Sequence, residues 1–215
     1  MTNIDKVAVI GAGVMGAGIA AHAANAGIAV ILLDVVPDGA SNRSVLAETA
    51  VNKLLKANPA PLMHRRNTRH IQTGNLDDDL SLLAECDLVI EAVIEDLEIK
   101  QDLYRRVDTA RKPGSIVTSN TSTIPLAKLV SGLPEGFARD FAITHFFNPP
   151  RYLRLLEVVA GAHTRADAIT SLQVFGDRAL GKSVVQCKDT PGFIANRIGI
   201  LWTTSAIRFA FEDQL

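Results

Sequence analysis

The stretch KVAVIGAGVMGAGIAAHAANAGIAVILLD, residues 6–34, decides the fold. The apolar run at residues 6–10 predicts a strand, and a helix is predicted over residues 14–25. A second apolar strand is predicted over residues 29–33 and ends at Asp34. Strand, turn, helix and strand within about thirty residues form a βαβ unit, whose two strands lie parallel in one sheet.

The turn of this unit has the pattern G-x-G-x-x-G and consists of Gly11, Ala12, Gly13, Val14, Met15 and Gly16. It follows a strand and opens a helix, and an acidic residue stands at the end of the next strand, so its context is that of a dinucleotide-binding turn. We expect Gly11 to form the tight turn, Gly13 to let the backbone approach a pyrophosphate, and Gly16 to let helix and strand pack closely. The phosphates would lie at the helix N-terminus. The alternative is a glycine-rich turn beside a solvated aspartate.

Asp34 indicates which dinucleotide is bound. A carboxylate at the end of the second strand accepts hydrogen bonds from the adenine-ribose hydroxyls and repels a 2′-phosphate. Its neighbours Val35 and Val36 supply no cation that could hold such a phosphate. The sequence therefore predicts NAD as the cofactor rather than NADP.

Composition and charge exclude several classes of protein. Of the 215 residues, 47% are hydrophobic, and the formal net charge is −1, which is typical of a globular chain and not of a disordered one. Lysines and arginines are scattered, so no nucleic-acid partner is expected. The uncharged run at residues 7–33 is long enough to cross a bilayer, but its glycines divide it into short elements, so no membrane span is expected.

The two cysteines suggest a reducing compartment. Cys86 and Cys187 stand far apart and have no C-x-x-C spacing, so we expect neither a disulfide framework nor a metal site. No signal-peptide pattern is visible at residue 1, and a cytoplasmic location is expected.

Beyond the βαβ unit, predicted strands and helices continue to alternate. Further strands are predicted at residues 71–73, 88–93, 115–119, 141–145, 155–159 and 183–187, and further helices at residues 40–56, 79–85, 97–110, 125–130 and 166–180. This alternation predicts an α/β fold, a Rossmann-type doubly wound, mostly parallel sheet with helices on both faces. Asp189-Thr190-Pro191 predicts the start of a last apolar helix, because proline favours the first helical turn. That helix has no terminal signal, so the chain is expected to be truncated.

A histidine and a glutamate are predicted to meet across two neighbouring strands. His145 ends an apolar strand, and Glu157 lies twelve residues later among leucines and valines. A buried carboxylate needs a partner, and an imidazole would supply it while the carboxylate fixes the tautomer and stabilises the imidazolium. This makes His145 a candidate general base for taking a hydroxyl proton while hydride passes to the nicotinamide. On spacing alone, a core histidine beside an unrelated glutamate explains the pattern equally well.

Six motifs in this order resemble the L-3-hydroxyacyl-CoA dehydrogenase family and span nearly the whole chain. They are GAGVMGAGIA (residues 11–20), EAVIEDLEIK (91–100), SNTSTIP (119–125), THFFNPP (144–150), LLEVV (155–159) and DTPGFIANRI (189–198). The resemblance implies NAD-dependent oxidation of an L-3-hydroxyacyl-CoA to the 3-ketoacyl-CoA, a step of fatty-acid β-oxidation. It also implies that His145 is the base and Glu157 its electrostatic partner.

The resemblance implies roles for five more side chains. Ser122 would hydrogen-bond the substrate oxygen and contact the cofactor, and Asn196 would help to orient substrate and histidine. Glu95 and Lys100 would contact the nicotinamide-side ribose, and Asn148 the nicotinamide region. Without the resemblance, simpler interpretations are favoured: a helix cap for Ser122, a solvated ion pair for Glu95 and Lys100, and a polar helix face for Asn196.

The family's second domain is implied only in part. An NAD-binding domain is expected over residues 1–188, and residues 189–215 would be the first helix of a truncated all-α C-terminal domain that forms a dimer interface and covers the acyl site. The expected partners are an acyl-CoA substrate and, with the helical domain present, a second copy in a homodimer. In relatives the helix after Asp34 supplies a serine and a lysine to CoA. Here Ala50 takes the serine position, which leaves Lys53 and Lys56, together with Ser122, as candidate CoA contacts.

Two other functions remain open. The chain could bind NAD without turnover, because the missing helices would leave the acyl site uncovered. It could also oxidise a free hydroxy acid or sugar acid on the same scaffold, although the HFFNPP motif disfavours this, because sugar-acid relatives vary the two residues after the histidine.

Overall fold

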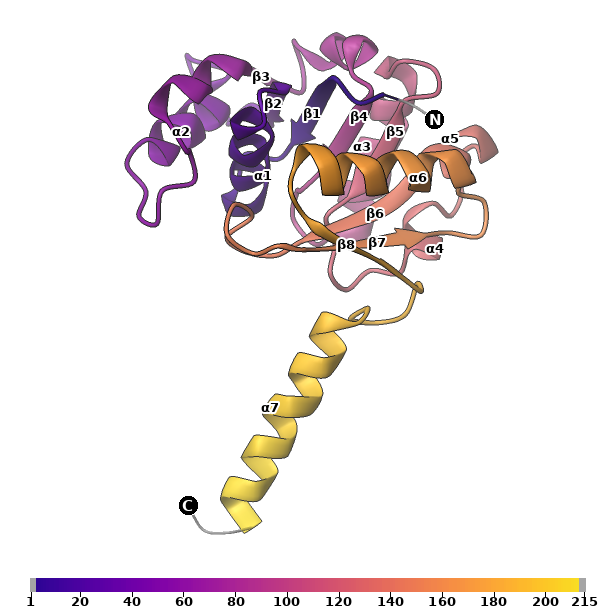
Figure 1. The fold of residues 1–215 in the computed structure, drawn as a ribbon. Coiled ribbons are helices and arrows are strands. Elements are labelled where there is room, and N and C mark those ends of the chain that lie inside the picture. The colour runs from indigo at the N-terminus through magenta and orange to yellow at the C-terminus, as the bar shows by residue number, and fades with distance from the viewer. Residues whose placement is uncertain (1–2, 213–215) are drawn as a thin grey trace.

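The computed structural model describes residues 3–212 and shows an eight-stranded sheet with helices on both faces (Figure 1). The strands are β1 Lys6–Ile10, β2 Ala29–Asp34, β3 Ile71–Asn75, β4 Leu88–Glu91, β5 Ile116–Ser119, β6 Phe141–Phe146, β7 Leu155–Ala160 and β8 Ser183–Cys187. Their order in the sheet is β3-β2-β1-β4-β5-β6-β7-β8. Neighbouring strands are parallel except β6 and β7, which are antiparallel. The predicted Rossmann-type doubly wound fold is confirmed.

Helices and single helical turns connect these strands. They are α1 Val14–Asn25, α2 Val45–Leu54, α3 Leu97–Ala110, α4 Leu126–Leu129, α5 Glu135–Asp140, α6 Ala166–Val174 and α7 Ala195–Glu212, with short 3₁₀ or π turns η1 Arg65–His70, η2 Leu80–Glu85 and η3 Phe175–Ala179. Parallel strands need such crossovers, because the chain must return to the same edge of the sheet before the next strand begins.

Alternate residues of each strand face opposite sides of the sheet and build two cores. In β1, Val7 and Val9 pack with residues of α1, α2 and α6, whereas Ala8 and Ile10 pack with residues of α3, α4 and α5. Both sides of β1 are fully buried, which explains why the strand is a continuous apolar run. Seven of the nine buried residues 16–24 of α1 are glycine or alanine, which allows that helix to approach the sheet closely.

Most of the predicted elements are present, and most differences lie at the ends of helices and strands. The helix predicted over residues 40–56 begins only at Val45, because the side chain of Asn42 accepts a hydrogen bond from the Ser44 amide and competes with helical pairing. The strand predicted over residues 88–93 ends at Glu91. The helix predicted over residues 79–85 is the 3₁₀ turn η2, and the helix predicted over residues 166–180 closes in the π turn η3. The elements η1 and α5 were not predicted.

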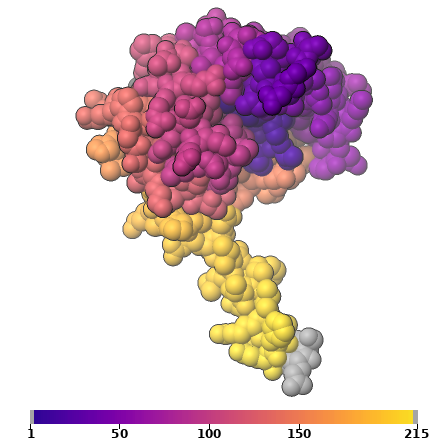
Figure 2. Space-filling view, turned by 180° about the vertical axis from the view of Figure 1, so that it is seen from behind, coloured from indigo at the N-terminus to yellow at the C-terminus, as the bar shows by residue number. Residues whose placement is uncertain are grey.

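The prediction that the last helix starts at Asp189–Pro191 is wrong. Gly192 and Phe193 have positive φ angles of 73° and 45°, which no right-handed helix accommodates, and α7 begins at Ala195. Beyond this turn α7 projects away from the rounded body formed by the sheet and its helices (Figures 1 and 2). Its apolar side chains Ile198, Leu201 and Trp202 are exposed. No helix within residues 3–212 combines the length and apolar character that a membrane span requires.

Candidate functional site

The glycine-rich turn lies at the carboxyl end of β1, beside β4. Gly11 has a φ of 102°, and a Cβ atom there would lie 2.6 Å from the carbonyl oxygen of Ala92. A Cβ atom on Gly16 would lie 1.8 Å from the carbonyl oxygen of Gly11. Both positions therefore require glycine, one for its backbone angle and for space and the other for space alone. Nothing lies within 4 Å of the Cβ position of Gly13, so the backbone is open to a ligand at this point.

Asp34 binds the same turn from the end of β2. Its Oδ2 accepts a hydrogen bond from the amide of Ala12 at 2.6 Å, and its Oδ1 accepts one from the amide of Val35 at 2.7 Å. Each carboxylate oxygen can accept more than one hydrogen bond, so both retain capacity for a ribose hydroxyl. An adjacent cavity of about 650 Å³ is lined mainly by apolar residues, including Val35 and Ile94, together with Asp34 and three further charged residues, Glu98, Asp102 and Arg106. A hydroxyl-binding carboxylate beside an apolar cavity fits the adenosine half of a dinucleotide.

A buried carboxylate that the sequence did not single out organises the ends of β4 and β5. Glu91 is 1% exposed and accepts hydrogen bonds from Lys100 Nζ at 2.6 Å, Tyr104 Oη at 2.6 Å and Ser119 Oγ at 2.7 Å. The Tyr104 phenol has a pKa well above its usual value, because it is buried and stands beside the charge of Glu91. Lys100 is also 1% exposed, so it is not part of a solvated surface pair.

Glu95 joins this buried cluster to the turn that carries Ser122. Its Oε2 lies 3.2 Å from Lys100 Nζ, and its Oε1 accepts hydrogen bonds from the hydroxyls of Thr121 and Thr123 and from the Ser122 amide at 3.3 Å. Burial alone would raise the pKa of Glu95, but these hydroxyl bonds and the charge of Lys100 outweigh it and lower the pKa to about 2. Glu95 therefore remains ionised and fixes the Ser122 turn.

The antiparallel pair β6 and β7 brings His145 and Glu157 directly opposite each other. His145 Nδ1 lies 2.8 Å from Glu157 Oε2, and the two residues are 6% and 0% exposed. With a carboxylate at Nδ1, that nitrogen is assigned as the donor, so Nε2 is left free to accept a proton. The other glutamate oxygen, Oε1, accepts hydrogen bonds from the amides of Ile194 at 3.1 Å and Ala195 at 2.8 Å. The pair is thus built from two strands and the start of α7.

Ser122 and Asn196 come together in a second cavity of about 660 Å³. This cavity, which we term the Ser122–Asn196 cavity, is also lined by Thr123, Gly192, Ala195 and residues of the first turns of α7. It adjoins the histidine and glutamate pair, because the amide of Ala195 binds Glu157. Asp189, two residues before Pro191, connects this segment to α4, because its carboxylate accepts hydrogen bonds from the amides of Leu126 and Ala127.

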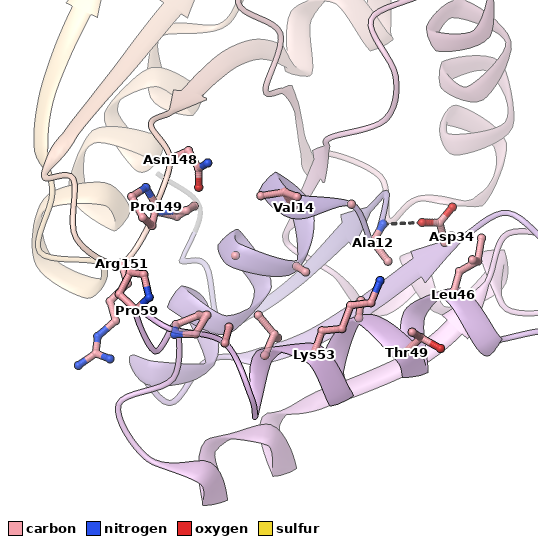
Figure 3. A pocket seen from close by; sticks show the side chains of 18 residues that line it. Ala12, Val14, Asp34, Leu46, Thr49, Lys53, Pro59, Asn148, Pro149 and Arg151 are labelled. Carbon is pink, nitrogen blue, oxygen red and sulfur yellow. Dashed lines mark hydrogen bonds between the residues drawn. The ribbon is translucent and has the colours of Figure 1, made fainter.

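A third cavity, also about 660 Å³, lies between α1, α2 and the loop after β6 (Figure 3). We term it the α1–α2 cavity. Asn148, Ala50 and Lys53 line it, whereas Lys56 does not. Figure 3 shows the ammonium of Lys53 pointing toward the side where Ala12 and Asp34 lie. Arg151, which sequence analysis missed, closes one end by donating to the carbonyl oxygens of Ala60 at 2.5 Å and Leu62 at 3.1 Å. Arg151 does not lie in a cluster of basic residues, so the sequence contains no signal for this contact.

No group of three or more His, Cys, Asp or Glu side chains within the described part of the chain is placed to hold a metal ion.

Comparisons with known proteins identify the family of this chain. The family model described as 3-hydroxyacyl-CoA dehydrogenase, NAD binding domain, matches residues 6–190. A probable 3-hydroxyacyl-CoA dehydrogenase of Bacillus subtilis is 49% identical over 92% of this chain, and one of Deinococcus radiodurans is 47% identical over 96%. The chain spans 27% and 60% of the lengths of these two relatives.

A solved structure resembles the whole described fold. The crystal structure of 3-hydroxybutyryl-CoA dehydrogenase from Escherichia coli superposes with a TM-score of 0.83 at 33% identity and covers 99% of this chain and 44% of that one. A family match over most of the chain, together with these identities, establishes its relationship. The chain belongs to the 3-hydroxyacyl-CoA dehydrogenase family and comprises the NAD-binding domain of that family.

Proposed function

We propose that this chain carries out, alone or as part of a longer protein, the NAD-dependent oxidation of an L-3-hydroxyacyl-CoA to the 3-ketoacyl-CoA in fatty-acid β-oxidation. The observation that carries this proposal is the buried pair of His145 and Glu157 beside the cavity of Ser122 and Asn196. An NAD-binding domain with a carboxylate-supported imidazole next to an open cavity has the parts that oxidation of an alcohol requires.

His145 acts as the general base in this mechanism. Its Nε2 accepts the proton of the substrate hydroxyl, while Nδ1 keeps its hydrogen bond to Glu157. The imidazolium that forms is stabilised by the glutamate, whose other oxygen is held by two backbone amides. When bound, NAD supplies the acceptor for the hydride that leaves the same carbon. The hydroxyl oxygen becomes the keto oxygen, and Ser122 donates a hydrogen bond to it.

Other side chains orient the reactants. Asn196 lines the Ser122–Asn196 cavity together with Ser122 and directs the substrate toward the histidine. Asn148 contacts the nicotinamide region from the loop after β6. Glu95 contacts the neighbouring ribose, and the buried Lys100 acts on that ribose through its ion pair with Glu95. Since Glu95 binds the Ser122 turn and Lys100 binds Glu95, the pair also holds that turn beside the cofactor.

The CoA part of the substrate lies in the part of the α1–α2 cavity that α2 lines, apart from Gly13 and Asp34, which line the same cavity and are assigned to the cofactor. Its lining is mostly apolar, with Lys53 as a cation on α2. An ammonium at the edge of an apolar cavity suits a phosphorylated nucleotide, because a lysine binds phosphate as a point charge. Lys56, one turn further along the chain, contacts a phosphate that extends beyond the cavity.

The domain boundary and the oligomer are also proposals. Residues 1–188 form the NAD-binding domain, and residues 189–215 begin a helical domain through which two copies form a homodimer. The exposed apolar side chains of α7 fit such an arrangement, because an unpaired apolar helix face needs a covering surface. The same observation favours a second candidate function, an NAD-binding unit without turnover of its own.

The decisive experiment follows NADH absorbance after acetoacetyl-CoA is added to the purified chain, with free acetoacetate and NADPH as controls. Turnover only with NADH and the thioester supports the proposed function, whereas equal turnover with free acetoacetate would favour a free-acid dehydrogenase. NADH binding without turnover would favour the non-catalytic unit. Replacing His145 by glutamine should leave NADH affinity unchanged and lower turnover by about two to four orders of magnitude, the usual contribution of general base catalysis.

A further inference from the structure

Phe193 stands in a strained position at the root of α7. Among residues 3–212 it is the one non-glycine residue with a positive φ, 45°. A side chain with a Cβ atom rarely adopts this conformation, and such strain persists only where the surroundings hold it. The ring is 4% exposed, so it is held by packing. A glycine would relieve the strain, and the presence of a phenylalanine therefore indicates that the ring or its placement is useful.

The strained turn makes two contacts with the proposed catalytic pair. The Phe193 ring lies against the imidazole of His145, with centroids 5.7 Å apart and planes inclined by 59°. The next two residues, Ile194 and Ala195, donate their amides to the oxygen of Glu157 that does not bind the histidine. One backbone conformation thus delivers a ring to the base and two donors to its partner.

The imidazole needs such support, because a single hydrogen bond does not fix a ring. The bond from Nδ1 to Glu157 sets one point, and the ring can still tilt about it. A second aromatic ring, Phe147, lies 4.5 Å from the His145 centroid at 57°. Two rings and one hydrogen bond together restrict the plane of the imidazole and therefore the direction of Nε2.

We propose that Phe193 is a positioning residue, whose strained backbone places its ring against His145 and the following two amides onto Glu157. This inference rests on the proposed function of His145 as the general base. Misplacement of a catalytic group by a fraction of an ångström slows the chemical step far more than it weakens binding. The proposal therefore predicts a change in kcat and not in the KM for NADH.

A matched control separates positioning from ordinary packing. Phe137 is also a buried aromatic residue of the same core, 1% exposed, and it packs against Tyr104 and Phe141. We expect Phe193→Leu and Phe193→Gly to lower kcat with acetoacetyl-CoA about tenfold to a hundredfold, with the KM for NADH within about twofold. Phe137→Leu should lower the unfolding midpoint in urea while kcat stays within about twofold.

Phe193→Gly tests the ring alone, because glycine accepts the positive φ and leaves the amides of residues 194 and 195 in place. If this variant retains full kcat, or if Phe137→Leu loses as much kcat as Phe193→Leu, the positioning role is overturned.

A readout without substrate distinguishes failure of this inference from failure of the proposed function. Proton NMR of the His145 Nδ1 hydrogen measures how well its bond to Glu157 is shielded from water. We expect slow exchange in the unmodified chain and in Phe137→Leu, and at least about tenfold faster exchange in Phe193→Gly. That result supports the positioning role even if the chain does not turn over acetoacetyl-CoA, whereas unchanged exchange in Phe193→Gly refutes it.

Discussion

Acid should destabilise this fold through His22, which is buried in α1 without a full set of partners. The side chain is 8% exposed, and its Nε2 donates to the carbonyl oxygen of Leu180 at 3.0 Å. Its Nδ1 has no hydrogen-bond partner within the described residues. Burial, assisted by the positive charge of Lys182, lowers the pKa of His22 from 6.5 to about 4.

The sign and size of the effect follow from this shift. The folded protein binds the proton of His22 less tightly than the unfolded chain, so between the two pKa values the unfolded chain holds more protons. The stability contributed by neutral His22 is therefore fully present above about pH 6.5 and is lost as the pH falls toward 4. Linkage gives a loss of about 2 kcal/mol between about pH 7.5 and pH 5, rising to about 3 kcal/mol below pH 4.

Urea unfolding of the chain and of His22→Leu at these two pH values measures this contribution. Leucine fills a similar volume and removes the unpaired nitrogen, so the variant should fold at neutral pH. The unmodified chain should lose about 2 kcal/mol more than the variant when the pH is lowered. His163→Leu, a change at an exposed histidine, should follow the unmodified chain. Equal losses in the chain and in His22→Leu would refute the reasoning.

Three further changes test the buried architecture of the site. Gly16→Ala puts a Cβ atom 1.8 Å from the carbonyl oxygen of Gly11, so NADH affinity in a fluorescence titration should fall at least about tenfold; unchanged affinity would show that the turn can shift freely. Asp34→Ala removes the acceptor of the Ala12 amide, and we expect weaker NAD binding with relaxed discrimination against NADP; an unchanged Kd for NAD would contradict the role of Asp34. Glu91→Gln places an amide among buried donors and should lower the free energy of unfolding in urea by on the order of 2 kcal/mol, a result contradicted by an unchanged urea midpoint.

Much of the fold could be predicted because its signals are local. A strand that is buried on both faces has a continuous run of apolar residues, and a tight turn between a strand and a helix requires glycine. Both patterns are visible in residues 6–34. Helix ends were less predictable, because they depend on contacts with distant residues. Pro191 suggested a helix start, but the positive φ angles of Gly192 and Phe193 belong to a turn whose following amides bind Glu157 in β7. No local pattern contains that partner.

The candidate site likewise contains residues that the sequence could locate and residues that it could not. The glycine turn and Asp34 were located from the sequence, because the elements that carry them are adjacent along the chain. Glu91 was missed, because its donors Lys100, Tyr104 and Ser119 lie 9, 13 and 28 residues away, and only the folded sheet brings them to one carboxylate. A glutamate inside an apolar strand was nevertheless a signal, since a buried charge requires partners. The same argument, applied to the predicted strand LVIEAV at residues 88–93, would have identified Glu91.

The direction of one strand explains why a histidine and a glutamate twelve residues apart can form a pair. β6 runs parallel to β5, so His145 lies near the edge where the carboxyl ends of the parallel strands meet. Because β7 returns antiparallel, its first residues lie beside the last residues of β6, and the register sets Glu157 opposite His145 on the same face. A shift of one residue would set Leu156 or Val158 there instead and would turn the carboxylate to the other face. A parallel β7 would need a crossover that returns the chain to the opposite edge of the sheet before β7 begins. The short antiparallel return therefore both buries the carboxylate and supplies it with the imidazole that its burial requires.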